Sequence, residues 1–135
     1  MLLYWIKKQN ERQSADISID SQMEKDVFES RPIFNPHGIN GIVIAQGARI
    51  GKNCRISHQV TIGRSMGGCP TIGDNVYIGP GAKIFGNIKI GNNVRIGANC
   101  PVFFDVPDNS TVVLPKPRII QKDENYTYYT LKEDY

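Results

Sequence analysis

The sequence has little of several features that mark common functional classes. Its formal net charge is only +3, from 16 basic and 13 acidic residues. It has no basic run interleaved with aromatic residues, which argues against nucleic-acid binding. The three cysteines, Cys54, Cys69 and Cys100, lack CxxC spacing, so they indicate neither a disulfide framework nor a zinc site. We interpret them as reduced thiols in a cytoplasmic protein.

Long apolar runs are also lacking. The first six residues, MLLYWI, are apolar, but Lys7 and Lys8 end that run. A membrane span needs about twenty apolar residues, and a signal peptide carries its basic residues before the apolar stretch. We therefore expect no membrane span, and we expect the apolar start to form a short helix packed on the main body.

What the sequence does have is a six-residue repeat. From Ile44 onward an aliphatic residue returns at every sixth position, and after one break of ten positions the series resumes at Ile72. A small or apolar residue follows four positions after most of them. An α-helix needs apolar residues three and four apart, and an ordinary strand needs strict alternation, so neither fits. The series is Ile44, Ile50, Ile56, Ile62, Ile72, Ile78, Ile84, Ile90, Ile96 and Val102.

This repeat predicts an all-β fold, a parallel β-helix in which three hexapeptides close one triangular coil of about eighteen residues. We expect the large aliphatic side chains to stack inside the prism. Asparagine and glycine supply the unusual backbone angles of the corners, as at Asn53, Asn75 and Asn93. The four extra residues between Ile62 and Ile72 predict a loop at one corner.

Three segments follow from this pattern. Residues 1–35 form a partly helical N-terminal segment, 36–107 the β-helix, and 108–135 a C-terminal edge strand and tail. The end of the tail is acidic and rich in tyrosine. It either covers the open end of the β-helix, whose strand edges would otherwise be exposed, or is disordered.

The two histidines are the residues best suited to acid–base chemistry. His37 stands at the entry to the repeat, in PHGINGIVI, and His58 stands one coil later, in ISHQVTI. Because a coil takes about eighteen residues, we expect the two side chains to lie near each other without being stacked. A neutral imidazole near pH 7 suits removal of a proton from a hydroxyl group. We predict that both are catalytic; a corner histidine with a structural hydrogen bond is the alternative for each.

These segments resemble the catalytic domain of serine acetyltransferases and of the related polysaccharide O-acetyltransferases. The resemblance covers roughly residues 36–120, and it is carried by the segments 37–44, 58–63 and 78–88. It implies a left-handed coil and a homotrimer with acetyl-coenzyme A in the groove between subunits. It also implies that His37 acts as general base on the acceptor hydroxyl, which attacks the thioester directly and needs no metal.

The resemblance also indicates where the coenzyme lies. Small residues of the later coils would let it approach the backbone. Lys116 and Arg118 stand where the family ends its coils beside the cofactor, and they would contact the nucleotide phosphates. Corner geometry for the small residues, and a solvated basic turn for the two cations, fit the sequence equally well. The small residues are Gly79, Gly81, Ala82, Gly97 and Ala98.

The sequence departs from serine acetyltransferases at the residues that hold the acceptor in that family. Where the family has an Arg-His pair before a proline, this chain has Gly68-Cys69-Pro70, in a shorter loop. Pro36 replaces the acidic residue that precedes the catalytic histidine. We therefore expect the acceptor to be a sugar hydroxyl, as in polysaccharide biosynthesis, with serine as the alternative.

Other possibilities stay open from the sequence. Asp16, Asp20 and Asp26 are candidates for a carboxylate that orients His37. A zinc-dependent carbonic anhydrase on the same fold needs three histidine ligands, and this chain has two. A non-enzymatic β-helix that only binds or scaffolds a partner needs no base at all.

Overall fold

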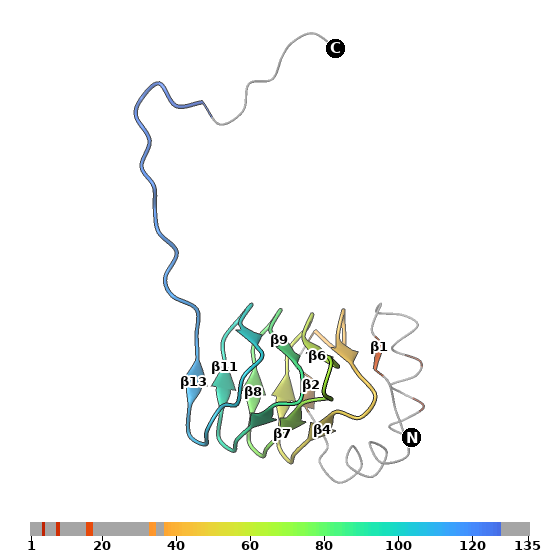
Figure 1. The fold of residues 1–135 in the computed structure, drawn as a ribbon. Helices are drawn as coiled ribbons and strands as arrows, with labels where there is room; N and C mark the ends of the chain where they lie inside the picture. Colours follow the sequence, from red (N-terminus) through yellow and green to blue (C-terminus); the bar gives the residue numbers. More distant parts are fainter. Residues whose placement is uncertain (1–3, 5–7, 9–15, 18–32, 35–36, 128–135) are drawn as a thin grey trace.

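The computed structural model describes residues 4, 8, 16–17, 33–34 and 37–127, and these residues form a parallel β-helix (Figure 1). Each strand has two or three residues, as expected for a chain that turns one corner in every six residues. The strands are β1 (Asp16–Ile17), β2 (Ile33–Phe34), β3 (Val43–Ile44), β4 (Arg49–Ile50), β5 (Arg55–Ile56), β6 (Thr61–Gly63), β7 (Thr71–Ile72), β8 (Tyr77–Ile78), β9 (Lys83–Phe85), β10 (Lys89–Ile90), β11 (Arg95–Ile96), β12 (Pro101–Val102) and β13 (Thr111–Val112).

The strands stack into three sheets, one for each face of a triangular prism. The orders are β1-β3-β6-β9-β12, β10-β7-β4 and β13-β11-β8-β5-β2, and all pairs are parallel. Val43 pairs with Thr61, 18 positions further along the chain. Thr61 pairs with Lys83, 22 positions further along, because the inserted loop lies between them. The predicted coil and the predicted insertion are both confirmed.

The aliphatic series fills the interior of the prism. Every member from Ile44 to Val102 is buried. In a two-residue strand such as β5, the first side chain points outward and the second points inward, because successive side chains lie on opposite faces. Burying each of these side chains contributes about 1.5–3 kcal/mol, so the stacked aliphatic column is the main source of stability.

One edge of the prism is an asparagine ladder, formed by Asn53, Asn75, Asn93 and Asn109. All four have φ values between 55° and 57°, in the left-handed region that asparagine tolerates better than most residues. The amide Nδ2 of Asn53 donates to Oδ1 of Asn75 at 2.8 Å, and Nδ2 of Asn93 donates to Oδ1 of Asn109 at 3.0 Å. The corner role predicted for three of them is confirmed, and Asn109 extends it by one coil.

We expect Asn75→Ala to lower the free energy of unfolding by about 1–2 kcal/mol, because alanine is strained at a positive φ. Asn75→Gly is the matched control, since glycine adopts this φ without strain but also loses the amide ladder. Urea unfolding followed by circular dichroism measures both. A loss from Asn75→Gly as large as that from Asn75→Ala would assign the cost to the amide bond instead of the backbone.

Paired strands extend beyond the range 36–107 at both ends. β1 pairs with β3 and β2 pairs with β5, so two strands of the sheets precede residue 36. Tyr4 and Lys8 are helical, and most of the N-terminal segment lies outside the described residues. No helix among the described residues has the length and hydropathy needed to cross a membrane.

After β13, the chain leaves the prism as an extended segment, residues 113–127, which we call the C-terminal arm (Figure 1). β13 is the edge strand expected in this region, and it ends at Val112. All fifteen residues of the arm are exposed. Residues 121–127 of the tail lie on this arm, away from the prism, and the rest of the tail lies outside the described residues, so its role stays a prediction.

Candidate active site

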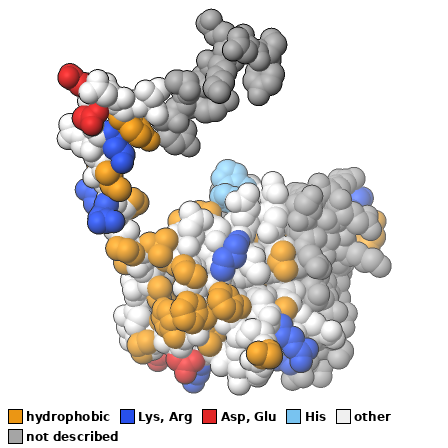
Figure 2. Space-filling model, turned by 45° about the horizontal axis from the view of Figure 1, so that its top comes forward, with side chains coloured by type: hydrophobic (Ala, Val, Ile, Leu, Met, Phe, Trp, Pro, Cys, Tyr) orange, Lys and Arg blue, Asp and Glu red, His pale blue; other side chains and the backbone are white. Residues whose placement is uncertain are grey.

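The two histidines meet at the edge of the prism between β5 and β6. Their ring centroids are 5.3 Å apart and the ring planes are inclined by 86°, an edge-to-face contact. The His37 side chain is exposed and that of His58 is half-buried. Figure 2 shows histidine at the surface of the prism, in pale blue. The proximity expected from the register is confirmed, and we call this edge the histidine corner.

Stacked backbone fixes the position of His58. Its carbonyl oxygen accepts a hydrogen bond from the N–H of Gly81 in the next coil at 3.1 Å. The following residue, Gln59, has φ of 58° and donates its N–H to the carbonyl of Asn40 at 2.8 Å. The backbone at His58 is thus hydrogen-bonded to the coils on both sides, which fixes the point from which its side chain projects.

His37 lies one turn before the first complete coil. Two residues later, Ile39 is fully buried, and its carbonyl accepts the N–H of Ile42 at 3.0 Å. This turn anchors the backbone beneath His37 while the imidazole stays accessible to solvent. The edge-to-face contact restricts how the His37 ring can rotate. The geometry therefore offers an oriented, accessible imidazole with a second imidazole behind it.

The contacts around His37 do not show which carboxylate, if any of the three predicted, orients its ring. Asp16 lies in β1, paired with Val43, and its side chain is outside the described part of the structure. Asp20 and Asp26 lie outside the described residues altogether. Their role stays a prediction.

Two of the glycines expected beside the coenzyme are required by the stacking of the coils. A Cβ atom on Gly79 would lie 2.9 Å from backbone atoms of the next coil. Gly81 has φ of 72°, and a Cβ there would overlap the amide oxygen of Asn99. Ala82 is fully buried in the core, so its side chain faces away from any ligand. These residues are small because of the fold, whether or not a coenzyme lies beside them.

Ala98 offers open surface, whereas a Cβ on Gly97 would lie 3.2 Å from the carbonyl oxygen of Val112. Gly97 is half-exposed, and Ala98 is exposed on the edge of the prism that carries His58. Lys116 and Arg118 are exposed in the C-terminal arm, which extends away from the prism (Figure 1). One chain alone therefore does not bring this basic pair to the histidines, and their contact with coenzyme phosphates stays a prediction.

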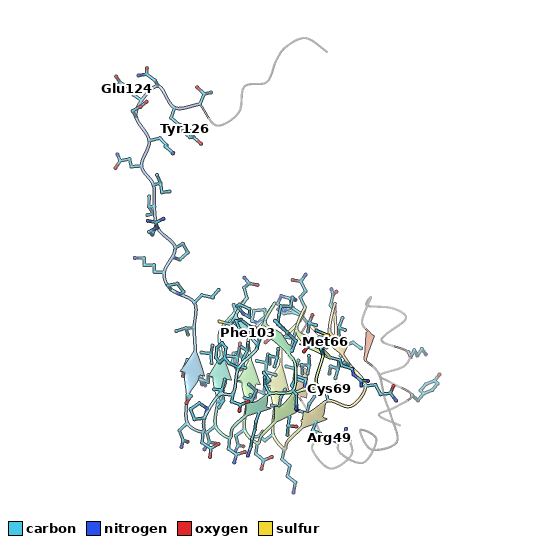
Figure 3. The ribbon with its side chains drawn as sticks, in the orientation of Figure 1. Arg49, Met66, Cys69, Phe103, Glu124 and Tyr126 are labelled. Atoms are coloured by element: carbon cyan, nitrogen blue, oxygen red, sulfur yellow. The ribbon has the colours of Figure 1, made fainter. Side chains whose placement is uncertain are left out.

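The inserted loop forms a short protruding turn at the next corner of the prism. Ser65 and Gly68 form an antiparallel bridge across it, and Met66 at its tip is fully exposed. Cys69 is half-buried and its Sγ donates to the carbonyl of Gln46 at 3.1 Å. Figure 3 shows Met66 and Cys69 on this loop. The loop was predicted from the break in the repeat.

The cysteines supply no evident nucleophile. All three are free thiols, as expected, and Cys54 and Cys100 are buried. Burial raises the pKa of the Cys54 thiol, which disfavours its thiolate form. Within the described residues, no three His, Cys, Asp or Glu side chains gather as a metal site would require, so the histidine pair has no third ligand there.

Sequence reasoning missed a shallow groove of about 720 Å³ on the face that contains β5, β8 and β11. Its walls include Arg55, Tyr77 and Arg95, and the guanidinium carbon of Arg95 lies 5.8 Å from the centre of the Tyr77 ring. Arg55, Tyr77 and Arg95 occupy matching positions in successive coils, and this repeated spacing is the sequence signal that could have revealed the groove. The groove contains neither histidine and no group suited to act as a base.

Comparison with known proteins agrees with this geometry. A model of the bacterial transferase hexapeptide family, six repeats, matches residues 69–100. The chain belongs to the hexapeptide-repeat transferase family. This hexapeptide-repeat protein is 46% identical over 97 residues to a serine acetyltransferase of Staphylococcus xylosus, covering 69% of this chain and 44% of that one. It is 35% identical over 127 residues to that of Buchnera aphidicola, covering 90% and 45%.

Solved structures show the same likeness. Serine acetyltransferase isoform 3 of Entamoeba histolytica, in complex with cysteine, matches with a TM-score of 0.61 and 36% identity over 81% of this chain and 36% of that chain. The enzyme of Neisseria gonorrhoeae, in complex with serine, matches with a TM-score of 0.57 and 38% identity over 76% and 39%. The hexapeptide-repeat protein thus spans less than half of each of these relatives. Each of these four relatives is named a serine acetyltransferase.

Proposed function

We propose that this hexapeptide-repeat protein is an acetyl-coenzyme A-dependent O-acetyltransferase that acetylates the hydroxyl group of serine. The observation that carries the proposal is the histidine pair on an accessible edge of the prism, His37 against His58 at 5.3 Å. The relatives named above support serine as the acceptor, since each bears the name serine acetyltransferase.

The reaction needs little more than a general base and a substrate bound in the correct position. His37 removes the proton from the acceptor hydroxyl, and the oxygen attacks the carbonyl carbon of the acetyl thioester. The tetrahedral intermediate collapses, the carbon–sulfur bond breaks, and the coenzyme leaves as a thiolate that recovers the proton from His37. Because a thioester is already activated, positioning supplies much of the remaining rate. In this scheme His58 is a positioning residue that limits rotation of the His37 ring.

The coenzyme and the assembly complete the proposal. We infer that acetyl-coenzyme A lies along the histidine corner against Gly97 and Ala98, with Lys116 and Arg118 available for its phosphates. The active unit is a cytoplasmic homotrimer with the coenzyme between adjacent prisms. These features rest on the family resemblance and on the exposure of these residues.

A second candidate acceptor is a sugar hydroxyl. The loop sequence Gly68-Cys69-Pro70 favours it, because it lacks the Arg-His pair that the family places before the proline. The half-buried Cys69 thiol is neither a cation nor a base comparable to that pair.

Purified protein should consume acetyl-coenzyme A when L-serine is added, followed by the loss of thioester absorbance and by mass spectrometry of O-acetylserine. A panel of L-threonine, free hexoses and nucleotide sugars tests the acceptor class. Transfer confined to a sugar would overturn the serine assignment. Calorimetric titration with acetyl-coenzyme A, with coenzyme A as competitor, tests the enzyme assignment itself. No heat and no turnover would favour a non-enzymatic scaffold.

A further inference from the structure

Three aromatic side chains form an exposed patch on the prism, and we call Phe85, Phe103 and Phe104 the aromatic patch. The rings of Phe85 and Phe103 stack with centroids 5.8 Å apart, and Phe103 meets Phe104 edge to face at 5.4 Å. Phe103 is 60% exposed. Figure 2 shows hydrophobic side chains gathered on one face of the prism. Contiguous exposed apolar patches are a common feature of interaction sites.

The C-terminal arm carries a second set of exposed apolar side chains. Ile119 is 94% exposed and Ile120 is 66% exposed. Pro115 and Pro117 fix their own φ angles and bias the residues before them toward extended backbone. At about 3.1 Å per residue, the nine residues 113–121 reach about 28 Å. The arm is therefore a stiff spacer that presents two adjacent isoleucines far from its own prism.

The end of the arm has local order. Asp123 accepts hydrogen bonds from the N–H of Asn125 through Oδ1 at 2.9 Å and from the N–H of Tyr126 through its carbonyl at 3.1 Å. The ammonium group of Lys122 lies 5.3 Å from the centre of the Tyr126 ring. Figure 3 shows Glu124 and Tyr126 at this end, well separated from the prism. Such a turn gives the arm a defined end beyond its isoleucines.

We propose that the C-terminal arm of one copy of this chain docks on the aromatic patch of a second copy, with Ile119 and Ile120 packed against the rings of Phe103 and Phe104. The patch and the arm hold nearly all the large apolar side chains that are exposed among the described residues; Tyr4 and Met66 stand apart. Docking would let the aromatic rings of the patch and the isoleucines of the arm bury each other's apolar surface.

Charge supports the same pairing. Arg118 and Lys122 flank the two isoleucines along the arm, and Asp105 directly follows the aromatic patch. One carboxylate oxygen of Asp105 accepts the N–H of Lys89 at 2.8 Å, and the side chain is exposed at the rim of the patch. Cations on the arm and a carboxylate at the patch favour this orientation of docking.

The geometry favours a second copy over the arm's own prism. The aromatic patch lies at the last residue of β9 and directly after β12, in one sheet, whereas the arm follows β13 in another sheet and extends away from the prism (Figure 3). Because the arm and the patch are different surfaces, the contact is head to tail. Head-to-tail contacts close into rings when the rotation permits, and a trimer is one such ring. The proposal does not depend on acetyl transfer.

Disulfide trapping between two differently tagged chains tests the pairing. One chain carries Phe103→Cys and the other Ile119→Cys, both with Cys69→Ser, and the two are co-expressed and mildly oxidised. We expect a disulfide that joins the two tags. The control chain carries Thr71→Cys, exposed on another sheet, and should link to Ile119→Cys far less. A third chain that carries both Phe103→Cys and Ile119→Cys tests for a link within one chain. No link between the two tags, equal linking to Thr71→Cys, or a link found only in this doubly substituted chain would overturn the proposal.

Assembly gives an independent readout. The double variant Ile119→Asp, Ile120→Asp should raise the dissociation constant of the assembly at least about tenfold, since each isoleucine loses its apolar contact. The control variant Gln121→Asp, Thr127→Asp adds the same charge without removing apolar surface. Light scattering over a range of concentrations measures both. An unchanged constant for the isoleucine variant, or a wild-type chain that remains monomeric, would overturn the proposal.

Discussion

His37→Ala is expected to lower kcat/KM for acetyl transfer by a factor of about 10²–10⁴, the usual contribution of a general base. The side chain is exposed, so its removal opens no cavity in the core and should leave the β-helix intact. Initial rates with acetyl-coenzyme A and the acceptor found in the panel measure the loss. Circular dichroism and thermal unfolding check that the fold persists.

His58→Ala is the matched control for this variant. His58 contacts His37 edge to face, so its removal frees the base to rotate but leaves the base in place. We expect a smaller fall in kcat/KM than for His37→Ala. Added imidazole should partly restore turnover in His37→Ala. Unchanged turnover in His37→Ala would contradict the assignment of this residue as the base.

Gly73→Ala is expected to lower the free energy of unfolding by about 2–3 kcal/mol, because the coils have no room for its methyl group. A Cβ on Gly73 would lie 2.8 Å from the carbonyl carbon and oxygen of Gly91 in the next coil and 2.5 Å from Oδ1 of Asn92. Backbone hydrogen bonds hold the coils at this spacing, as between the N–H of Gly73 and the carbonyl of Ile90 at 2.9 Å. Denaturant unfolding followed by circular dichroism measures the loss.

Gly63→Ala separates coil stacking from the general effect of replacing glycine. A Cβ on Gly63 would meet the Cβ of Phe85 at 3.6 Å, an ordinary van der Waals contact, and neither glycine has a positive φ. Both variants lower the entropy of the unfolded chain equally, so Gly63→Ala should change stability by no more than about 0.5 kcal/mol. Similar losses at both positions would show that stacking is not the cause.

The coils were predictable because one physical requirement recurs at a fixed spacing. On either side of the inserted loop, every sixth side chain must point inward, and all members of the aliphatic series from Ile44 to Val102 are buried. The pairing of β1 and β2 was not predictable from the repeat, since Asp16 pairs with Val43, 27 positions further along. That spacing is longer than a coil and carries no repeated signal.

The candidate site was predictable in part. The register placed His37 near His58, and the break in the repeat located the loop. The stacking role of Gly79 and Gly81 was weighed but could not be decided, because it depends on how closely the next coil approaches. The acceptor could not be derived from local pattern either, since it depends on which groups surround the histidine corner in three dimensions. The sugar acceptor expected from the loop sequence finds no support among the relatives named above.

The inserted loop has a consequence for how such proteins diversify. It adds four residues between β6 and β7, yet Ile50 still pairs with Ile72 and Ile62 with Ile84. Loop length and composition can therefore change while the neighbouring strands and the histidine corner keep their positions. Sequence changes in this loop therefore carry little risk to folding, and foreign peptides can be grafted at the fully exposed Met66 for the same reason.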